Sequence, residues 1–459
     1  MANSPTIDEL SREELIVIVR EQQLQIEALG KLIEQLKRKK SRQASPFSKE
    51  KPVPNPKRPG RKKGEGPFNR RQAPPGKPDV TVEAKAPSCC PDCGGSLEQT
   101  GVEQATTVEL PKLPTPRITA YQVAVCRCRD CGKKVRGTAP GLAADQFGAT
   151  AHRVGPTVMA AAHSLHYGMG IPLRKVPTVL SELTGVRITQ SALTQDALRR
   201  AKGEAGAEYQ ALRASVKDSA FVHTDDTGWR VGGKVAYLMG FETADVCLYQ
   251  IRMRHRNEEV REVIPGDYGG VMISDRGKSY EAKEFVRVEQ QKCLAHFLRN
   301  ITDVVVEKRG RAREFGLKGK ALLREAMELG RAREGLPEAE FVEKVEDVRR
   351  RVTHHLRDRV LKDGDNQKLL HGLGKQNDEG FLLRFLYPPY VEPTNNRAER
   401  MLRPAVIARK VSHCSKNQAG ADAFATFASL AQTARKNGSG SVTETFRQLF
   451  SKPTVASAR

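Results

Sequence analysis

Apolar side chains recur at alternating intervals of four and three residues near the start of the chain. Ser11 and Glu14 have the spacing of a capping box, so we expect one helix over residues 8–38. Such a seam favours a coiled coil, formed by residues 1–40, that joins copies of the chain. A helix packed on the chain's own core is the alternative. The seam positions, all apolar except one, are Leu15, Val19, Gln22, Ile26, Leu29, Ile33 and Leu36.

Runs of alternating or continuous apolar residues, typical of β-strands, begin near residue 219. Residues 219–223 form a short strand-like run, and 234–241 and 246–253 alternate like the strands of a hairpin. Residues 270–274 form an apolar run typical of a buried strand. The pattern therefore predicts a mixed sheet in the second half of the chain.

A long helical stretch follows these strands. Residues 281–378 contain a single proline, Pro337, and are rich in Glu, Lys, Arg, Ala and Leu. A further helix is expected to open near Asn396 and to continue to about Arg409. Together these patterns predict a multidomain α+β protein whose core, residues 219–410, contains a helical insertion over about 281–378.

Helical patterns also flank this core. Residues 141–218 predict a helical segment, in which 171–201 have the proportions of a helix-turn-helix around Thr184–Arg187. A segment of this kind either reads DNA or is an ordinary packed helix pair. Residues 411–459 predict a helical tail, in which Gly438 ends one helix and Ser441 begins another.

Basic residues are concentrated between the first helix and the folded part. Residues 37–72 hold fourteen basic and two acidic residues, a net +12 out of +23 for the 459-residue chain. Nine prolines recur between residues 46 and 78, so we expect the linker, residues 41–87, to be disordered. Charge this dense and of one sign favours phosphate binding, with Lys62 and Lys63 among the contacts, over a run that is merely solvated.

The first residues lack the basic and apolar regions of a signal peptide, and no stretch approaches 18 uninterrupted apolar residues. The nine cysteines are odd in number and clustered, which argues against a disulfide framework. We therefore expect a protein of the cytoplasm, with reduced thiols and without membrane insertion.

Six of the cysteines lie between residues 88 and 140. Two CxxC pairs, each followed by glycine, predict a small zinc-binding domain, because four thiolates close a tetrahedral structural site. The expected ligands are Cys90, Cys93, Cys128 and Cys131, while Cys89 and Cys126 are neighbouring cysteines that spacing alone does not exclude. A redox pair is the alternative.

Carboxylates follow two of the predicted strands. Asp225 and Asp226 come at the end of the first, before the turn-like residues 227–233, and Asp275 directly follows the fourth. Carboxylate oxygens at the edge of a sheet suit Mg²⁺ or Mn²⁺ better than zinc. Solvated carboxylates at strand ends are the alternative interpretation.

Four motifs resemble those of bacterial transposases of the insertion sequence 66 family, which belong to the DDE group. They are His223-Thr224-Asp225-Asp226-Thr227, Ser274-Asp275-Arg276-Gly277-Lys278-Ser279-Tyr280, Cys293-Leu294-Ala295-His296 and Asn396-Arg397-Ala398-Glu399-Arg400-Met401-Leu402-Arg403-Pro404. The resemblance covers nearly the whole chain and keeps the family's domain order. It departs from the pattern at Asp226, where glutamate is usual, at Leu294, where an aromatic residue is usual, and over residues 411–415, which replace an aromatic-Gly-Ser run.

The resemblance implies a ribonuclease H-like, retroviral integrase-like catalytic core with Asp225, Asp275 and Glu399 as its catalytic acids. These acids would hold two Mg²⁺ (or Mn²⁺) ions for DNA strand cleavage and strand transfer. The implied partners are the element's terminal repeats, target DNA, a second copy of the chain and small accessory proteins, on the bacterial nucleoid. A DNA-binding regulator or domesticated non-cutting relative, and a structure-selective nuclease on the same fold, are the alternative functions.

Basic residues flank Glu399 and are expected to contact phosphates near the metal ions. The roles of Cys293 and His296 stay open between support of the core, half of a second metal site and ordinary packing. The expected phosphate contacts are Arg397, Arg400, Arg403, Arg409 and Lys410.

Overall fold

The computed structural model describes residues 79–451 except 85–86, 103–104, 108–113, 144–145 and 439, together with positions 19, 22, 23 and 26. The predicted coiled coil (apart from those four positions) and most of the predicted linker, Lys62 and Lys63 included, therefore lie outside the described residues. The chain forms two compact units, Met1–Pro111 and Lys112–Arg459.

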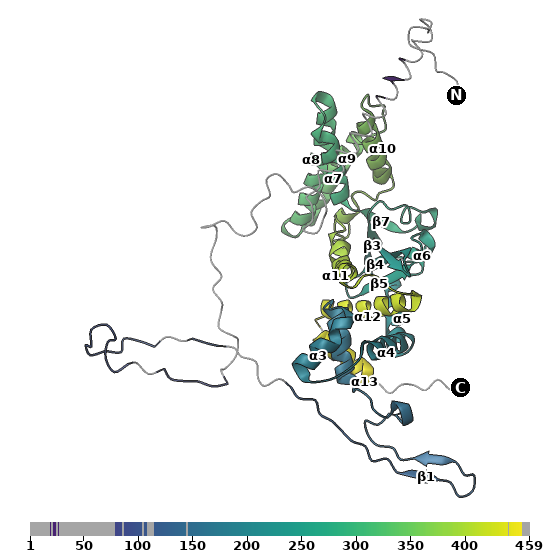
Figure 1. Ribbon diagram of the computed structural model, residues 1–459. Coiled ribbons are helices and arrows are strands. Elements are labelled where there is room, and N and C mark those ends of the chain that lie inside the picture. Colours follow the sequence, from purple (N-terminus) through teal and green to yellow (C-terminus); the bar gives the residue numbers. More distant parts are fainter. Residues whose placement is uncertain are drawn as a thin grey trace, which may run out of the picture. The chain divides into compact units, whose positions relative to one another are not determined.

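A five-stranded mixed sheet forms the centre of the second unit, with strand order β5-β4-β3-β6-β7 (Figure 1). The middle strand β3 pairs with β4 in antiparallel and with β6 in parallel orientation, β4 pairs antiparallel with β5, and β6 pairs in parallel with β7. This sheet and its many helices confirm the predicted α+β class. The strands are β3 (Phe221–Val231), β4 (Lys234–Glu242), β5 (Cys247–Arg252), β6 (Val271–Ser274) and β7 (Glu289–Lys292), and a separate antiparallel pair is formed by β1 (Val125–Arg127) and β2 (Lys134–Arg136).

Two strand boundaries differ from the prediction. Strand β3 does not end at His223 but continues to Val231, because Trp229 and Val231 are buried on the same face as Phe221. The turn is confined to Gly232 and Gly233, both of which have positive φ. Asp225 therefore lies within a strand that is paired on at least one side over its whole length.

Strand β7 was not predicted. Because this strand occupies residues 289–292, the helical insertion begins at residue 294 and not near 281. Its sequence is Glu-Gln-Gln-Lys, which carries no apolar pattern. Polar partners compensate: Gln291 Nε2 donates to Leu382 O (3.1 Å), and Gln291 Oε1 accepts from Phe385 N (2.9 Å). Hydrogen bonding to buried backbone groups replaces apolar packing here.

Helices cover both faces of the sheet and extend beyond its β7 edge. They are α2 (Pro156–His163), α3 (Val176–Thr184), α4 (Gln190–Lys202), α5 (Glu204–Ser215), α6 (Asn257–Arg261), α7 (Leu294–Val306), α8 (Gly310–Ala332), α9 (Glu338–His355), α10 (Gly364–Asp378), α11 (Asn396–Ser412), α12 (Gln418–Lys436) and α13 (Val442–Ser451). Among the described residues, no helix is long and apolar enough to cross a membrane.

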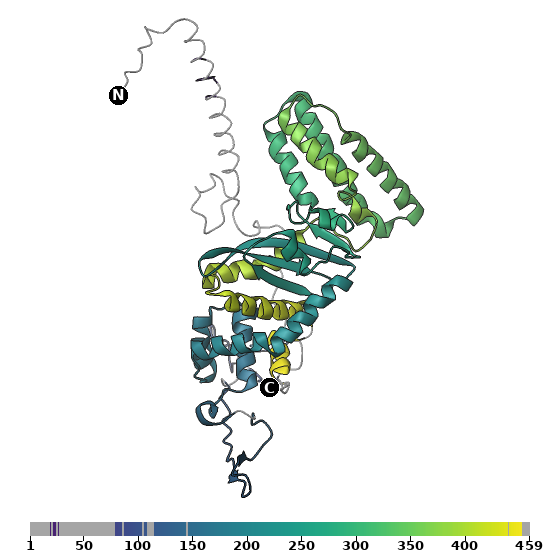
Figure 2. The same ribbon diagram turned by 90° about the vertical axis from the view of Figure 1, so that its right-hand side faces the viewer.

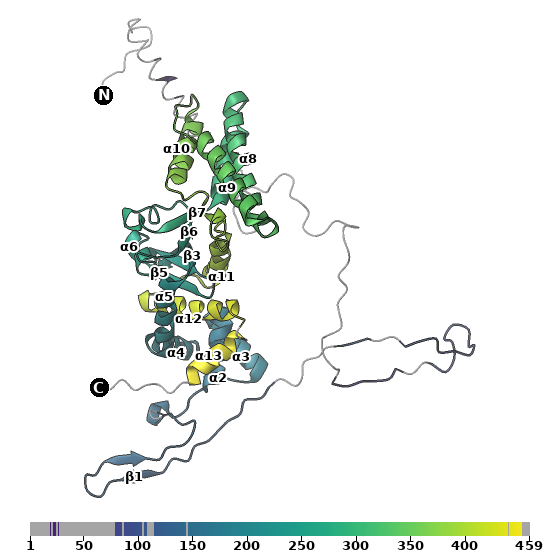
Figure 3. The same ribbon diagram turned by 180° about the vertical axis from the view of Figure 1, so that it is seen from behind.

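The two faces of β3 pack against different helices. Helix α11 lies on one face, where Met401 and Leu402 join a core with Leu238 (Figure 1, and from behind in Figure 3). On the opposite face, Tyr209 of α5 and Val260 of α6 belong to a core with Val222 of β3. Because side chains alternate along a strand, Asp225 faces α11 and Asp226 faces α6.

Helix α12 covers the free edge of β5. Thr433 Oγ1 accepts from Cys247 N (3.0 Å), and Ser429 Oγ accepts from Tyr249 N (2.8 Å). Side-chain hydroxyls thus take the place of a sixth strand at an edge that would otherwise be open to pairing with another chain. The segment predicted as a tail therefore begins with a helix of the folded core. The predicted start of its last helix is confirmed, because Ser441 Oγ accepts from Glu444 N (3.1 Å).

Helices α7–α10 form the predicted helical insertion and stand together beyond β7 (Figure 2). Pro337, the single proline of this stretch, lies at the N-cap of α9, between α8 and α9. Leu322, Phe341 and Leu370 share one core with Val271 and Ile273 of β6. The insertion is therefore packed continuously with the sheet.

The helix pair expected within 171–201 is present as α3 and α4, separated by Gly185 in the left-handed conformation. A buried polar network ties this pair to the C-terminal helices. Asp196 accepts from His163 Nε2 (2.8 Å) and from Arg200 Nε (2.7 Å), and the His163 ring stacks on Phe427 of α12. Burial alone would raise the pKa of Asp196, but the hydrogen bond from His163 and the charge of Arg200 outweigh it and hold that pKa well below its usual range.

Replacing Asp196 by Asn should lower the free energy of unfolding at pH 7 by about 2–4 kcal/mol, because the buried Arg200 guanidinium and the His163 ring lose their charged acceptor. The folded-state pKa lies below the unfolded value, so the stabilisation is fully present above pH about 4 and disappears as the pH falls further. Urea unfolding of both proteins between pH 7 and pH 3 measures the effect.

The exposed partner Arg199, which is 2.8 Å from Asp196, supplies the control. Arg199→Ala should change the free energy of unfolding by less than about 0.5 kcal/mol, as for other surface ion pairs. Equal stability of wild type and Asp196→Asn at pH 7, or a difference that grows on acidification, would contradict this account.

Candidate active site

Each of the two CxxC pairs forms the same kind of turn. Gly94 N donates to Cys90 O (2.8 Å), and Gly132 N donates to Cys128 O (3.0 Å). Both glycines have positive φ, which explains why glycine follows each pair. Backbone N–H groups at the following residues hydrogen-bond to the Cys90 and Cys128 thiols and lower their pKa, which favours the thiolate form.

The neighbouring cysteines lie outside these turns. Cys126 is part of β1, and Cys89 precedes the first turn. Cys93 and Cys131 lie inside these turns, where Cys93 hydrogen-bonds to the Cys90 thiol and Cys131 to the Cys128 thiol. Within each turn the geometry thus favours the pair chosen from spacing.

The predicted acids come from three different elements of the second unit. Asp225 lies in β3, Asp275 directly follows the neighbouring strand β6, and Glu399 lies in the first turn of α11. Asp275 Oδ1 accepts from Gly277 N (3.0 Å), which fixes the turn after β6. The parallel pairing of Val222 and His223 of β3 with Met272 and Ile273 of β6 brings the residues just after β6 alongside the part of β3 that holds Asp225.

Asp225 is affected by the charges of the other carboxylates. Burial, and then the negative charges of Asp275, Asp226 and Glu399, raise the pKa of Asp225 to about 7. A hydrogen bond from Asp226 N to Asp225 Oδ1 (2.9 Å) opposes this shift. Asp275 and Glu399 therefore lie near enough to Asp225 for their charges to affect its protonation. Among the described residues, however, no group of three or more His, Cys, Asp or Glu side chains is close enough to hold a metal ion as it stands.

Asp226 belongs to the opposite face of β3. Its Oδ1 lies 3.3 Å from His255 Nδ1, and the His255 ring packs edge-on against Tyr280. Burial raises the pKa of Asp226, while His255 lowers it. Asp226 therefore acts on Asp225 through its charge and backbone.

Close packing at one glycine holds α11 against the sheet. Gly240 of β4 is paired with Asp225 of β3. A Cβ at Gly240 would lie 2.2 Å from Met401 Cε and 3.0 Å from Leu402 Cδ2. Only a residue without a side chain allows α11, and with it Glu399, to approach β3 this closely.

Cys293 and His296 lie at the start of α7, between the acid-bearing segments. The Cys293 thiol is buried, which raises its pKa and keeps it protonated, and it accepts a hydrogen bond from Asn395 N (3.2 Å). His296 is half-buried with an unpartnered Nδ1 among the described residues. Burial and then Arg299 lower the pKa of His296, whereas Asp275 and Glu399 oppose them. Both residues thus lie next to segments that carry the predicted acids.

The basic residues of α11 divide into two groups. Arg397 Nε lies 3.2 Å from Glu242, and Arg409 donates to Gly228 O, so both of these side chains bond to the sheet. Arg400, Arg403 and Lys410 are exposed. Arg299, also exposed, lies 3.5 Å from Glu399. Three predicted phosphate contacts are therefore free to reach a ligand.

Two buried residues at the site escaped the sequence analysis. Lys292 is completely buried, its Nζ donates to Ser274 Oγ (3.1 Å), and burial lowers its pKa to about 8. Asn395 is 1% exposed and donates to Thr224 O (2.8 Å). Lys292 directly precedes the Cys293–His296 motif and Asn395 directly precedes the Asn396–Pro404 motif, so their positions were the only signal in the sequence.

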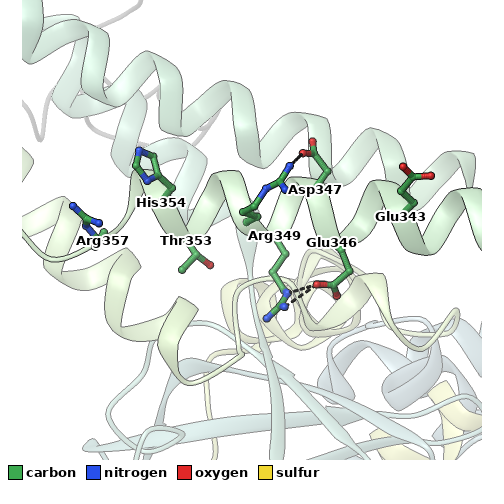
Figure 4. Close-up of a pocket in the computed structure, with 8 residues that line it drawn as sticks. Glu343, Glu346, Asp347, Arg349, Thr353, His354 and Arg357 are labelled. Atoms are coloured by element: carbon green, nitrogen blue, oxygen red, sulfur yellow. Dashed lines mark hydrogen bonds and ion pairs between the residues drawn. The ribbon is translucent and has the colours of Figure 1, made fainter.

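A surface hollow of about 750 Å³ lies away from these acids, along the outer side of α9 (Figure 4). Its charged side chains pair along the helix, as Arg349 does with Glu346 and Arg350 with Asp347. It contains none of the predicted site residues, and several of its charges are already paired.

Comparison with known proteins supports the motifs. The family described as "Transposase IS66 family" matches residues 152–423, a range that contains Asp225, Asp275 and Glu399. The chain is also similar to the uncharacterized protein y4hP of Sinorhizobium fredii (strain NBRC 101917 / NGR234). The two are 24% identical over 392 residues, which cover 78% of this chain and 69% of that protein.

The close approach at Gly240 predicts a cost for a single added methyl group. Gly240→Ala should lower the free energy of unfolding by about 1–2 kcal/mol, because Met401 and Leu402 must shift. Gly228→Ala, on the neighbouring strand, is the control, because its Cβ would meet only Arg409 Nη1 at 3.7 Å. Urea unfolding distinguishes the two, and equal stability of the two variants would refute the role of Gly240.

Proposed function

The chain belongs to the transposase IS66 family, and we propose that it is a DNA transposase that cuts the ends of an insertion sequence and joins them to target DNA. The observation that carries this proposal is the placement of Asp225 in β3, Asp275 directly after β6 and Glu399 in the first turn of α11, where the charges of Asp275 and Glu399 act on Asp225. Carboxylates whose pKa is raised by partial burial and by neighbouring like charges are common where a protein uses them for chemistry.

The sheet supports a ribonuclease H-like catalytic core. Its three antiparallel strands are followed by two parallel ones, with acids on the first and fourth strands in chain order. Helix α11 supplies the third acid after an insertion of helices. These features agree with the core that the motifs imply.

The donor set at this site fits a divalent cation. The three side chains offer only carboxylate oxygens, which Mg²⁺ and Mn²⁺ prefer, and they carry negative charge that a cation would neutralise. We propose Asp225, Asp275 and Glu399 as the ligands. A Mg²⁺ ion held by these residues would supply the positive charge that an in-line displacement at phosphorus needs at its attacking and leaving oxygens.

The chain's own basic residues would hold the DNA strand. Arg400, Arg403 and Lys410 are exposed on α11 and are proposed to bind phosphates next to the acids. Arg397 and Arg409, by contrast, are bonded to Glu242 and to Gly228 O, and are proposed to hold α11 on the sheet so that Glu399 faces Asp225.

The remaining parts of the chain are proposed to recognise and pair the element ends. The basic linker with Lys62 and Lys63, the zinc turns and the α3–α4 pair would bind terminal repeats. The heptad seam over residues 15–36 would join two copies of the chain, and small accessory proteins would assist on the bacterial nucleoid. The predicted charge and periodicity support these roles.

Replacing Glu399 by Gln should lower Mg²⁺-dependent cleavage and joining of a labelled DNA end by about 10³-fold, the equivalent of about 4 kcal/mol of lost transition-state stabilisation. The cause is the loss of one negative oxygen ligand with little change of shape. Glu340→Gln, an exposed substitution on α9, is the matched control and should keep full activity.

Three outcomes of this assay separate the candidate functions. Equal activity of wild type and Glu399→Gln would refute the catalytic assignment. Cleavage without joined product would favour a structure-selective nuclease. DNA binding without cleavage under all conditions would favour a regulator or a domesticated relative.

We also propose that Cys90, Cys93, Cys128 and Cys131 bind structural zinc. Protein purified under reducing conditions should contain about one zinc ion per chain. Cys128→Ser should lose zinc, whereas Cys126→Ser should keep it, because Cys126 lies in β1 outside the turn. Metal analysis of the three proteins tests this, and a zinc content near zero in the wild type would remove the assignment.

A further inference from the structure

Three buried polar side chains meet where the acid-bearing segments join. His223 comes from β3, Cys293 from the start of α7, and Asn395 from the residue before α11. All three are at most 1% exposed. Polar groups are buried at a cost unless they bond to one another, so their meeting point has a structural purpose.

The side-chain amide of Asn395 both donates and accepts a hydrogen bond, and its backbone N–H donates a third. Its Nδ2 donates to Thr224 O (2.8 Å), which leaves Oδ1 as the acceptor for His223 Nδ1–H (3.1 Å). Its backbone N–H donates to Cys293 Sγ (3.2 Å). Although Asn395 is at the N-cap position of α11, its side chain does not cap that helix. The amide is turned towards β3 instead.

Every one of these bonds leads to a catalytic acid. Thr224 directly precedes Asp225. The Cys293 N–H donates to Ser274 O (2.9 Å), and Ser274 directly precedes Asp275. The Asn395 carbonyl accepts from Glu399 N (3.2 Å) in the first turn of α11. One residue thus connects, through short bonded paths, to all three acids.

We infer that Asn395 is a positioning residue that sets the spacing of Asp225, Asp275 and Glu399 at the metal-binding centre. This inference rests on the proposed function. The short amide of Asn suits the junction because it donates and accepts at once. Asp would place an oxygen against Thr224 O, and Ala would leave both Thr224 O and His223 Nδ1 unpaired.

The acids need such a junction because they repel one another. Their like charges oppose a close approach, so hydrogen bonds between the segments that carry them help to hold them together. An amide next to the ligands acts like the groups that orient metal ligands in other proteins, whose loss typically weakens metal affinity or activity about 10–100-fold.

The test compares full-length wild type, Asn395→Ala and the control Asn377→Ala, an amide that bonds to Thr353 on the insertion surface. Mn²⁺ binding to the protein–DNA complex is measured by electron paramagnetic resonance. Cleavage is measured against Mg²⁺ concentration, and folding by thermal unfolding. Asn395→Ala should bind Mn²⁺ about 10–100-fold more weakly, need correspondingly more Mg²⁺, and stay folded at the assay temperature. Asn377→Ala should behave like the wild type.

A second pair of variants keeps the inference testable if Asn395→Ala does not fold. Cys293→Ser preserves an acceptor for the Asn395 N–H, whereas Cys293→Ala removes it. The serine variant should therefore keep Mn²⁺ affinity closer to that of the wild type than the alanine variant does.

The inference is overturned if a folded Asn395→Ala binds Mn²⁺ like the wild type, or if its cleavage falls only in proportion to the folded fraction. Equal Mn²⁺ affinities of Cys293→Ser and Cys293→Ala would also count against it. If the wild type itself fails to cut DNA, the proposed function fails. The Mn²⁺ affinities still decide separately whether Asn395 positions the acids.

Discussion

The mutual repulsion of Asp225, Asp275 and Glu399 is the constraint on which the rest of this structure depends. Burial and the negative charges of Asp275, Asp226 and Glu399 raise the pKa of Asp225 to about 7, so these carboxylates do not stay together unaided. They come from positions 50 and 124 residues apart in the sequence. The fold must therefore hold distant segments against an unfavourable electrostatic interaction, and much of its packing serves that end.

Several contacts share this task. Parallel pairing of β3 and β6 sets Asp225 beside Asp275. Gly240 lets α11 approach the sheet, and Arg397 and Arg409 bond the same helix to β4 and β3. Helix α12 covers the open edge of β5. The helical insertion lies between β7 and α11 in the sequence, and it shares a hydrophobic core with β6.

Residue patterns predicted those features that depend on local sequence. The hairpin of β4 and β5, the long helices around Pro337, the start of α11 and the cap at Ser441 were all predicted and are present. Strand β7 was missed because its buried side chains are Gln and Lys, held by hydrogen bonds that no apolar pattern reveals. The end of β3 was misplaced because the polar pair Asp225–Asp226 resembles a strand end. In the structure both aspartates lie inside the strand.

The candidate site shows the same division. Its acids were identified from motifs, since Asp225 and Asp275 adjoin apolar strand-like runs and Glu399 lies at the start of a helix that the sequence predicts. Lys292 and Asn395 could not be identified, because their importance lies in partners far away in the sequence, such as Ser274 and Thr224. Whether Arg397 would bond to the sheet or face solvent was equally a question of tertiary structure.

The central claim is that Asp225, Asp275 and Glu399 together bind a divalent cation next to DNA. Anomalous diffraction from crystals of the protein–DNA complex soaked in Mn²⁺ tests it most directly. The account predicts anomalous density in contact with Asp225 and at least one of the other two carboxylates, and its loss in Asp225→Asn. Mn²⁺ bound elsewhere on the protein, with none at these three carboxylates, would contradict the account.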